Sequence, residues 1–451
     1  MNIASNFSGW MSQDDFFVGK WQSIYSHGID VLRSPSELKL MPWIEKSDTY
    51  DNTLQTTSIF SPVADLVWYA RSDGWIREYE TGNGVIQISN PSQIISNGIL
   101  FLGNFYIFTD RYVYKTTYSA GALSAISTWY DPGSNEWWHH PVSYQGGEMY
   151  FPSGKNVKYT DSTGALQTLF SVDFSNNVRG LSIQGSNLRI YSDKLISIVD
   201  IGTKTVSYSQ VLPFTPTGVT TDGIIDYVTT DSNELYICSG LEWRKIAGKT
   251  LSPQLEAYTN SPKFTFTTSK FSPCISYSNG VLYTINQEED RIMAYGRKME
   301  WIPNAFAYLP ITSAQTTTLI NEFSCVFALN GEVYTGHKVG SDYQVWRMSY
   351  TRSEWNCANG VYIIPPTDFG DYSVLKQIEE IRVGKTGTGG ELWCSINEWT
   401  FELVGALDQT DLEQKFMTYK KDFRQISFMI KLSASSDVVR NIDLRFTNRI
   451  V

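Results

Sequence analysis

The histidines and cysteines of the chain define which metal or nucleophile chemistry its residues could support. The four histidines are His27, His139, His140 and His337. A zinc site needs three or four convergent ligands, and the sequence contains no HxxxH spacing and no Cys/His pairing. The five cysteines are scattered without CxxC spacing, which is typical of free, buried thiols in a protein that folds in a reducing cytoplasm: Cys238, Cys274, Cys325, Cys357 and Cys394. We therefore expect no metal site and no cofactor.

Carboxylate pairs are the second source of reactivity, because a glycosidase needs two of them facing each other across a sugar. The candidates are Glu288, Glu289, Asp290, Glu379 and Glu380. The first three form a run at an expected hairpin tip, where acidic residues usually contact water. The segment Ser72–Trp75 partly resembles the Asp box of sialidases, but it is incomplete and occurs once. No GxSxG, HExxH, GxGxxG or P-loop motif occurs. We expect a protein that is not an enzyme, with a glycosidase as an alternative.

The segment STWYDPGSNEWWHHP, residues 127–141, is the strongest candidate binding site. Four large aromatic side chains flank its DPGSN turn and could stack on sugar faces or anchor a partner protein. The candidate residues are Trp129, Tyr130, Trp137, Trp138, His139 and His140. Consecutive Trp137 and Trp138 point to opposite faces of an extended strand, so one of them at most joins a given platform. The alternative is that these tryptophans pack in the core between neighbouring sheets.

Short strands are the elements that must position these residues. Aromatic residues make up 14% of the chain, its 33 glycines punctuate it, and alternation with period 2 dominates. One pattern recurs about seven times: a turn, an alternating strand, a polar turn and a second strand. The copies begin at Ala64, Asn97, Gly146, Gly185, Asp222, Asn279 and Asn330.

The spacing of these copies, roughly 33–57 residues, is close to the period of β-propeller blades. Each hairpin is too small to bury its apolar face alone, whereas radial stacking covers both faces of every blade. Solenoid β-helices have shorter periods, and the WD40 and Kelch signatures are not supported. We predict an all-β fold with a β-propeller of about seven blades over residues 61–362.

The flanking segments do not follow this repeat. Residues 1–60 are predicted to form an extended N-terminal arm, and residues 363–371, which contain two prolines, a linker. Residues 372–451 carry longer strands and are predicted to form an antiparallel, β-sandwich-like domain. A short helix is expected at Asp411–Phe423, with Asp411 as its N-cap.

Charge and hydropathy exclude two classes of partner. The net charge of −10 and the lack of Lys/Arg runs argue against specific nucleic-acid binding. No stretch approaches the roughly 18 apolar residues of a transmembrane segment. The N-terminal sequence has neither the basic nor the apolar region of a secretory signal.

The arm contains a block, GIDVLRSPSELKLMPW, that resembles a segment near the N-terminus of virion proteins from tailed bacteriophages. The matching residues are Gly28, Asp30, Arg33, Ser34, Pro35, Leu38 and Leu40. The closing strands, FRQISFMIKLSASSDVVRNIDLRFTNRIV, are similar to the C-terminal β-domain of such proteins. The resemblance covers about a quarter of the chain; unlike many tail nozzle proteins, this chain is short and lacks obvious inserted domains.

This resemblance implies a structural subunit of a phage tail, of the nozzle or ring-like type, which is assembled in the host cytoplasm and located in the virion. Its partners would be copies of itself in a ring and other tail proteins. Some such proteins also carry host-attachment parts, for which a host surface glycan is a candidate ligand. The arm would pair with an adjacent subunit by strand addition, or alternatively close its own chain. A glycan-binding adhesin that uses the 127–141 segment or the propeller mouth, and a propeller glycosidase, are the alternative functions.

Overall fold

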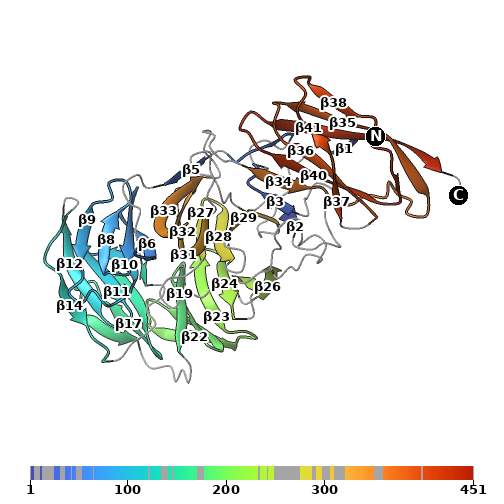
Figure 1. The fold of residues 1–451 in the computed structure, drawn as a ribbon. Coiled ribbons are helices and arrows are strands. Elements are labelled where there is room, and N and C mark those ends of the chain that lie inside the picture. The colour runs from blue at the N-terminus through green and yellow to red at the C-terminus, as the bar shows by residue number, and fades with distance from the viewer. Residues whose placement is uncertain are drawn as a thin grey trace.

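The protein is all-β in the computed structural model (Figure 1). The model describes residues 2–4, 11–12, 25–30, 36–41, 43–46, 53–63, 65–119, 122–133, 141–144, 147–169, 177–231, 234–240, 242–247, 275–286, 291–296, 305–308, 320–349, 359–397 and 400–449. All regular elements within these ranges are strands. The fold class predicted from the sequence is thereby confirmed.

Seven antiparallel blades follow one another from Thr56 to Ser349. Blade 1 contains β6 (Thr56–Val63), β7 (Leu66–Arg71), β8 (Trp75–Glu78) and β9 (Gly84–Gln87). Blade 2 contains β10 (Ile95–Phe101), β11 (Asn104–Thr109), β12 (Val113–Ser119), β13 (Ala122–Leu123) and β14 (Ser127–Tyr130). Blade 3 contains β15 (Val142–Tyr144), β16 (Glu148–Ser153), β17 (Asn156–Thr160) and β18 (Leu166–Leu169).

The remaining blades have the same order of strands, from the propeller axis outward. Blade 4 contains β19 (Val178–Gln184), β20 (Asn187–Ser192), β21 (Leu195–Asp200) and β22 (Thr205–Val211). Blade 5 contains β23 (Pro216–Thr221), β24 (Asp226–Thr230), β25 (Leu235–Ser239) and β26 (Glu242–Ala247). Blade 6 contains β27 (Ile275–Ser278), β28 (Val281–Asn286), β29 (Arg291–Gly296) and β30 (Ala305–Tyr308). Blade 7 contains β31 (Ile320–Leu329), β32 (Glu332–Val339), β33 (Asp342–Ser349) and, from the arm, β5 (Trp43–Lys46).

Local sequence explains the tight hairpins at the start of several blades. Asn279 and Gly280 have φ angles of 48° and 83°, and Asn330 and Gly331 have 54° and 81°. Positive φ at both central residues is the requirement of the two-residue turn that matches the twist of a β-hairpin, and Asn-Gly is its preferred sequence. The second strands, such as β11 and β24, are buried along nearly their whole length, as expected for strands covered on both faces by neighbouring blades.

Side-chain contacts join neighbouring blades around the whole ring. Four of these contacts are between aromatic rings, with distances given between ring centroids. Trp68 of blade 1 lies 5.1 Å from Phe105 of blade 2, and Phe108 of blade 2 lies 5.4 Å from Phe151 of blade 3. Tyr227 of blade 5 lies 5.5 Å from Tyr277 of blade 6, and Tyr334 of blade 7 lies 5.1 Å from Tyr79 of blade 1. An apolar cluster joins blades 3 and 4, and an ion pair joins blades 4 and 5. Ser276 of blade 6 accepts a hydrogen bond from the amide of Ala328 in blade 7. The propeller is therefore a closed ring.

The C-terminal domain is a sandwich of two sheets (Figure 1). One sheet contains β1 (Asn2–Ala4), β41 (Val438–Arg449), β35 (Leu375–Thr386), β38 (Glu413–Phe416), β39 (Asp422–Phe423) and β4 (Leu38–Lys39). The other contains β3 (Tyr25–His27), β34 (Gly360–Ile363), β40 (Ile426–Leu432), β36 (Glu391–Ile396) and β37 (Phe401–Ala406). The second sheet continues through β3 into β30 of blade 6, which also pairs with β2 (Met11–Ser12). One apolar core runs from blades 6 and 7 into the sandwich.

The structure corrects the predicted helix. Residues 413–416 and 422–423 of that segment form strands on β35, within a described range that contains no helix. Gln414 is buried in β38, and its amide donates to the carbonyl oxygen of Ala406 at 2.6 Å. Pairing with a sheet edge and a buried hydrogen bond outweigh the helical propensity of this short segment, which is the usual outcome when tertiary contacts compete with local preference.

The structure also moves both predicted domain boundaries. Residues 43–46 belong to blade 7 and β6 begins at Thr56, so the predicted arm of residues 1–60 includes parts of the propeller. The predicted linker of residues 363–371 begins inside a sheet, because Ile363 pairs with Met429 and Thr367 bridges Ile426. Backbone pairing with β40 therefore extends the sandwich to Gly360.

The arm residues that carry the resemblance are placed within their own chain. The amide of Met41 donates to the carbonyl oxygen of Gly28, and the amide of Asp30 donates to that of Lys39. Leu38 and Leu40 are fully buried in the shared core, and Leu38–Lys39 pairs with β41. Arg33, Ser34 and Pro35 lie outside the described residues. The described part of the arm therefore packs and pairs within its own chain, which is the alternative to pairing with an adjacent subunit.

Gly360→Ala is predicted to destabilise the protein by about 1–3 kcal/mol through overpacking. A Cβ atom at Gly360 would lie 2.5 Å from Ile29 Cδ1 and 2.8 Å from Leu40 Cδ2, so the arm would have to move away from β34. Urea unfolding of both proteins measures the difference. The matched control is Gly147→Ala, where a Cβ would meet nothing closer than 3.8 Å and little change is expected. Equal stabilities for the two variants would contradict this account of the arm.

Candidate functional site

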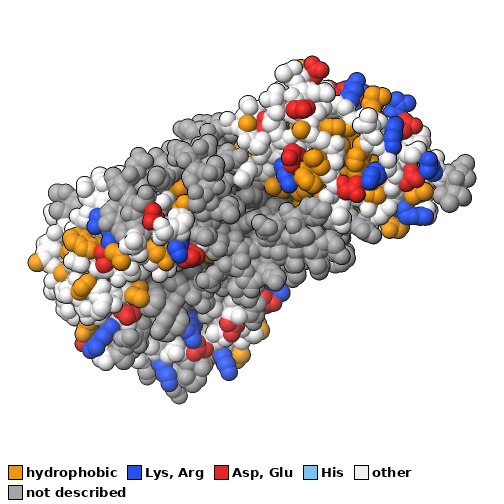
Figure 2. Space-filling model, viewed as in Figure 1, with side chains coloured by type: hydrophobic (Ala, Val, Ile, Leu, Met, Phe, Trp, Pro, Cys, Tyr) orange, Lys and Arg blue, Asp and Glu red, His pale blue; other side chains and the backbone are white. Residues whose placement is uncertain are grey.

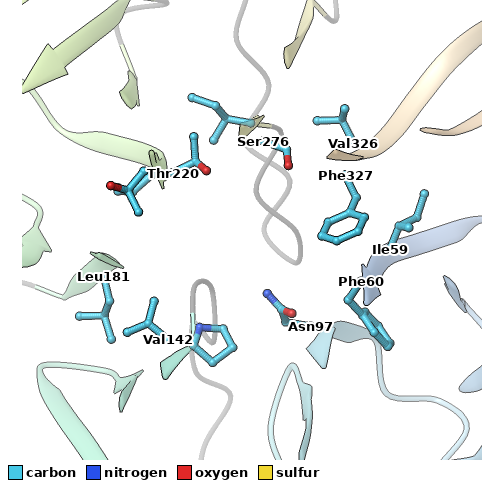
Figure 3. A pocket seen from close by; sticks show the side chains of 13 residues that line it. Ile59, Phe60, Asn97, Val142, Leu181, Thr220, Ser276, Val326 and Phe327 are labelled. Carbon is cyan, nitrogen blue, oxygen red and sulfur yellow. The ribbon is translucent and has the colours of Figure 1, made fainter. Parts of the chain in front are cut away.

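A site with room for a small molecule lies on the propeller axis. It is a cavity of about 220 Å³ (Figure 3). All seven blades contribute lining residues, which come from their axis-proximal strands or the residue just before one: Ile59, Phe60, Asn97, Pro141, Val142, Leu181, Val219, Thr220, Thr221, Ile275, Ser276, Val326 and Phe327. The cavity therefore exists because the ring closes, and no single blade could form it.

The cavity wall combines apolar side chains with a few uncharged polar groups. The ring of Phe327 points toward the middle of the cavity, and the side-chain nitrogen of Asn97 points in from another wall (Figure 3). Thr220 and Ser276 add hydroxyl groups from blades 5 and 6. None of the lining residues is acidic, basic or a cysteine. The lining can hold a neutral molecule by packing and hydrogen bonds, and it offers no acid, base or nucleophile.

Sequence reasoning offered the propeller mouth as an alternative glycan site but identified none of the residues that line this cavity. Its residues are those found in any buried strand, and they are distributed from Ile59 to Phe327 without a motif. The usable signal was the position of each residue in the first strand of a repeat unit. That signal becomes specific only when the ring geometry is known.

The aromatic candidate segment is only partly described. Trp129 and Tyr130 pack between blades 2 and 3: Trp129 meets Tyr106 at 4.9 Å and Phe151 at 5.8 Å between ring centroids. The hydroxyl of Tyr130 is 3.2 Å from that of Ser153. Both rings are therefore used in holding two blades together. Trp137, Trp138, His139 and His140 lie outside the described residues.

A cluster of potentially reactive side chains lies between blades 4 and 5. Arg189 Nη1 lies 3.3 Å from Asp226 Oδ2 and 3.2 Å from Cys238 Sγ. The same carboxylate oxygen accepts hydrogen bonds from Ser182, at 2.8 Å, and from Tyr191. Arg189 Nη2 donates to the carbonyl oxygen of Gly240 at 2.7 Å. The cluster links β19 and β20 to β24 and β25.

Burial makes the two nucleophile candidates of this cluster unreactive. Burial raises the pKa of Cys238 to about 11, in spite of the nearby Arg189 guanidinium. Burial and the neighbouring Asp226 carboxylate raise the pKa of Tyr191 well above its ordinary value. A thiol and a phenol that stay protonated at neutral pH are poor nucleophiles. The arrangement is that of a buried ion pair that fixes the register of two blades.

The remaining candidate groups also serve structure. Glu379 and Glu380 pair with Arg445, at 3.0 Å, and Arg382, at 2.9 Å, in the C-terminal domain. Asp73 pairs with Arg71 at 2.6 Å in the turn between β7 and β8, which is where the Asp-box-like segment lies. Glu288, Glu289 and Asp290 lie outside the described residues. The described carboxylates named here do not form a pair across a cleft.

His337 is the one histidine whose side chain is described. It is fully buried in blade 7, where its Nδ1 lies 2.9 Å from the hydroxyl of Thr335 and its ring packs against Phe323 and Trp346. Burial lowers the pKa of His337 to about 3. The imidazole is therefore neutral at physiological pH and belongs to the core of the blade.

The described residues contain no group of three or more His, Cys, Asp or Glu side chains placed to hold a metal ion. In the same part of the chain, no helix has the length and apolarity of a membrane span.

Comparison with known proteins identifies the fold. No family model matches the sequence, and no curated protein matches it. Virginiamycin B lyase from Staphylococcus aureus is similar in structure, with a TM-score of 0.51 at 10% identity over 68% of this chain and 99% of that one. The Neurospora crassa Pan2 WD40 domain has a TM-score of 0.46 at 10% identity, over 67% of this chain and 91% of its own. The Myceliophteria thermophila Cps50 (Swd1) β-propeller domain has 0.47 at 11% identity, over 66% and 98%. At 10% identity the likeness to the lyase, whose TM-score is above 0.5, shows the fold alone, which is a β-propeller.

Asp226→Asn is predicted to lower the free energy of unfolding by about 3–5 kcal/mol, because it leaves the Arg189 guanidinium buried without its counter-charge. Denaturant unfolding measures this loss. Asp131→Asn is the matched control, since it breaks an Arg–Asp pair with Arg111 in which both side chains are more than a third exposed, and little change is expected. A small effect at Asp226 would contradict the role given to the cluster.

His337 is predicted to make the protein less stable in acid. Its folded-state pKa of about 3 lies below the unfolded value of about 6.5, so protons bind the unfolded chain first as the pH falls. This group should remove about 2 kcal/mol of stability between pH 7 and pH 5. His337→Gln should lack this component, which unfolding of both proteins at the two pH values would reveal. An identical pH dependence would show that the imidazole is not held neutral.

Proposed function

We propose that the protein is a structural subunit of a bacteriophage tail, of the nozzle or ring-like type, which acts through oligomeric assembly and not through catalysis. The observation that carries the proposal is the placement of the segment that resembles those virion proteins. Ile29, Leu38, Leu40 and Met41 are buried in the core that runs from blades 6 and 7 into the sandwich, and Leu38–Lys39 is paired with Val438–Val439. Two domains that share one core in this way suit a subunit whose neighbours must dock at fixed positions.

The distribution of exposed apolar side chains supports assembly through the C-terminal domain. Among the described residues, eight large hydrophobic side chains are exposed, and four of them lie in this smaller part of the chain: Tyr372, Leu403, Leu412 and Met417. Figure 2 shows apolar side chains on the surface of this domain, interspersed with charged ones. Apolar surface rimmed by polar residues is typical of protein interfaces. We place the contacts with other subunits there.

Charge fits the same proposal. The net charge of −10 would repel DNA that passes near such a ring and so prevent it from adhering. The virion is the corresponding location, after assembly in the host cytoplasm. A host-attachment role would be an addition to this structural one.

The purified chain is expected to form a closed oligomer, with a mass in light scattering several times the 51.1 kDa of one chain. Negative-stain electron microscopy should show rings of uniform symmetry. Leu412→Asp places a charge on a side chain that is 72% exposed in the C-terminal domain, and it should shift the oligomer toward monomers. Val211→Asp, at a position 68% exposed on the outer edge of blade 4, is the matched control and should leave the mass unchanged.

A strict monomer at every concentration would count against the ring-subunit proposal. Release of reducing sugar from a polysaccharide by the wild-type chain would replace it with the glycosidase alternative. A mass that falls equally in both Asp variants would show that the C-terminal domain is not the contact surface.

A further inference from the structure

We propose that the axial cavity of the propeller is a binding site for one neutral pyranose unit, either a free monosaccharide or the end of a longer glycan. The inference rests on the size, charge and polar groups of the cavity and is independent of the role in a phage tail. It goes beyond structural assembly because it gives the ring interior a ligand of its own.

The size of the cavity limits the ligand. Its volume of about 220 Å³ lies below the roughly 300–1,000 Å³ of pockets that hold drug-sized molecules. A single six-membered ring with its substituents is of the right scale, whereas a nucleotide or a chain of several sugars is too large. Seven blades enclose the cavity from all sides around the axis, so only one end of a longer molecule could enter.

The charge of the cavity wall limits the ligand further. The lining contains no Asp, Glu, Lys, Arg, His or Cys. An ionised ligand would therefore be taken out of water without a counter-charge, which is strongly unfavourable. Metal ions, phosphates, carboxylates and amines are excluded on this ground, and a neutral ligand remains.

The polar groups of the wall require a ligand with hydroxyl groups. Asn97 Oδ1 accepts a hydrogen bond from the amide of Gly98 at 2.7 Å, which fixes the side chain and leaves its Nδ2 atom as a donor. Ser276 Oγ accepts from the amide of Ala328 at 2.9 Å, so its hydroxyl hydrogen can be donated. Thr220 supplies a second hydroxyl group. These groups belong to blades 2, 6 and 5, and a ring with hydroxyl groups on several sides can reach more than one of them (Figure 3).

The apolar part of the cavity wall matches the apolar face of a sugar ring. The ring of Phe327 points into the cavity (Figure 3), and Val142 and Leu181 lie on the other side. Carbohydrates combine polar edges with an apolar face formed by C–H groups, and such a face packs well on an aromatic ring. A purely apolar ligand would fill the same volume but leave the donors of Asn97, Thr220 and Ser276 without partners.

The test is saturation-transfer NMR followed by titration of the full-length protein with defined probes. The neutral probes are the methyl glycosides of glucose, galactose and mannose and N-acetylglucosamine; the charged probes are glucuronate, glucosamine and sialic acid. We expect saturable binding of at least one neutral probe, with a Kd near the millimolar range that a few hydrogen bonds and one stacking contact provide. The charged probes should bind at least about tenfold more weakly.

Two conservative variants show whether binding occurs in the cavity. Thr220→Val removes a hydroxyl group at nearly constant volume, and Asn97→Asp retains the acceptor for Gly98 but replaces the inward-pointing donor with a charge. Each should weaken binding of the neutral probe by about three- to tenfold or more. Thr117→Val, at an exposed position of β12 outside the cavity, is the matched control and should bind as the wild type does. Thermal unfolding checks that all three variants are folded.

Several outcomes would overturn the inference. These are the absence of saturable binding to any neutral probe, equal binding of charged probes, and binding that survives both cavity variants. The first would mean that water alone occupies the cavity, and the last would place the sugar site elsewhere. None of these outcomes bears on the oligomer measured by light scattering, so the failure of this inference and the failure of the proposed function can be distinguished.

Discussion

The pairing of Trp43–Lys46 with Trp346–Ser349 completes blade 7, the blade through which the ring closes. Without β5, blade 7 would end at β33 and have three strands where the other blades have at least four. Blade 7 also contacts both blade 6 and blade 1, through Ala328–Ser276 and Tyr334–Tyr79. A misplaced β5 would therefore disturb the last blade and, through it, the two blades that it joins.

Apolar burial alone would not fix the order and tilt of seven similar blades, because hydrophobic contact has little directionality. The blade 4–5 interface adds direction through the Arg189–Asp226 ion pair, which accepts only one relative placement of β20 and β24. A second polar contact joins blades 3 and 4, where the Lys204 ammonium pairs with Glu148 and lies 5.4 Å from the centre of the Tyr150 ring. The buried Arg189–Asp226 pair costs desolvation energy, and its benefit here is a defined geometry.

The sequence predicted those features that repeat and missed those that depend on distant pairing. All seven unit starts, from Ala64 to Asn330, fall in or next to the strands of seven successive blades, because hairpin signals are local. The segment 411–423 and the arm were misassigned because their conformation is set by β35, β41 and β33, which no local pattern identifies. The residues that line the axial cavity could not be identified from the sequence for the same reason.

The arm also determines when the fold can be completed. Its strands pair with partners near the other end of the chain: Lys46 with Trp346, Leu38 with Val439 and Asn2 with Asp443. Contacts between residues so far apart in sequence pay the largest loop-closure entropy, so they form after the local hairpins. Since the same arm closes the propeller and joins both sheets of the sandwich, the two domains cannot be completed independently. Cooperative unfolding of the whole chain follows from this topology, because loss of the arm would open both domains at once.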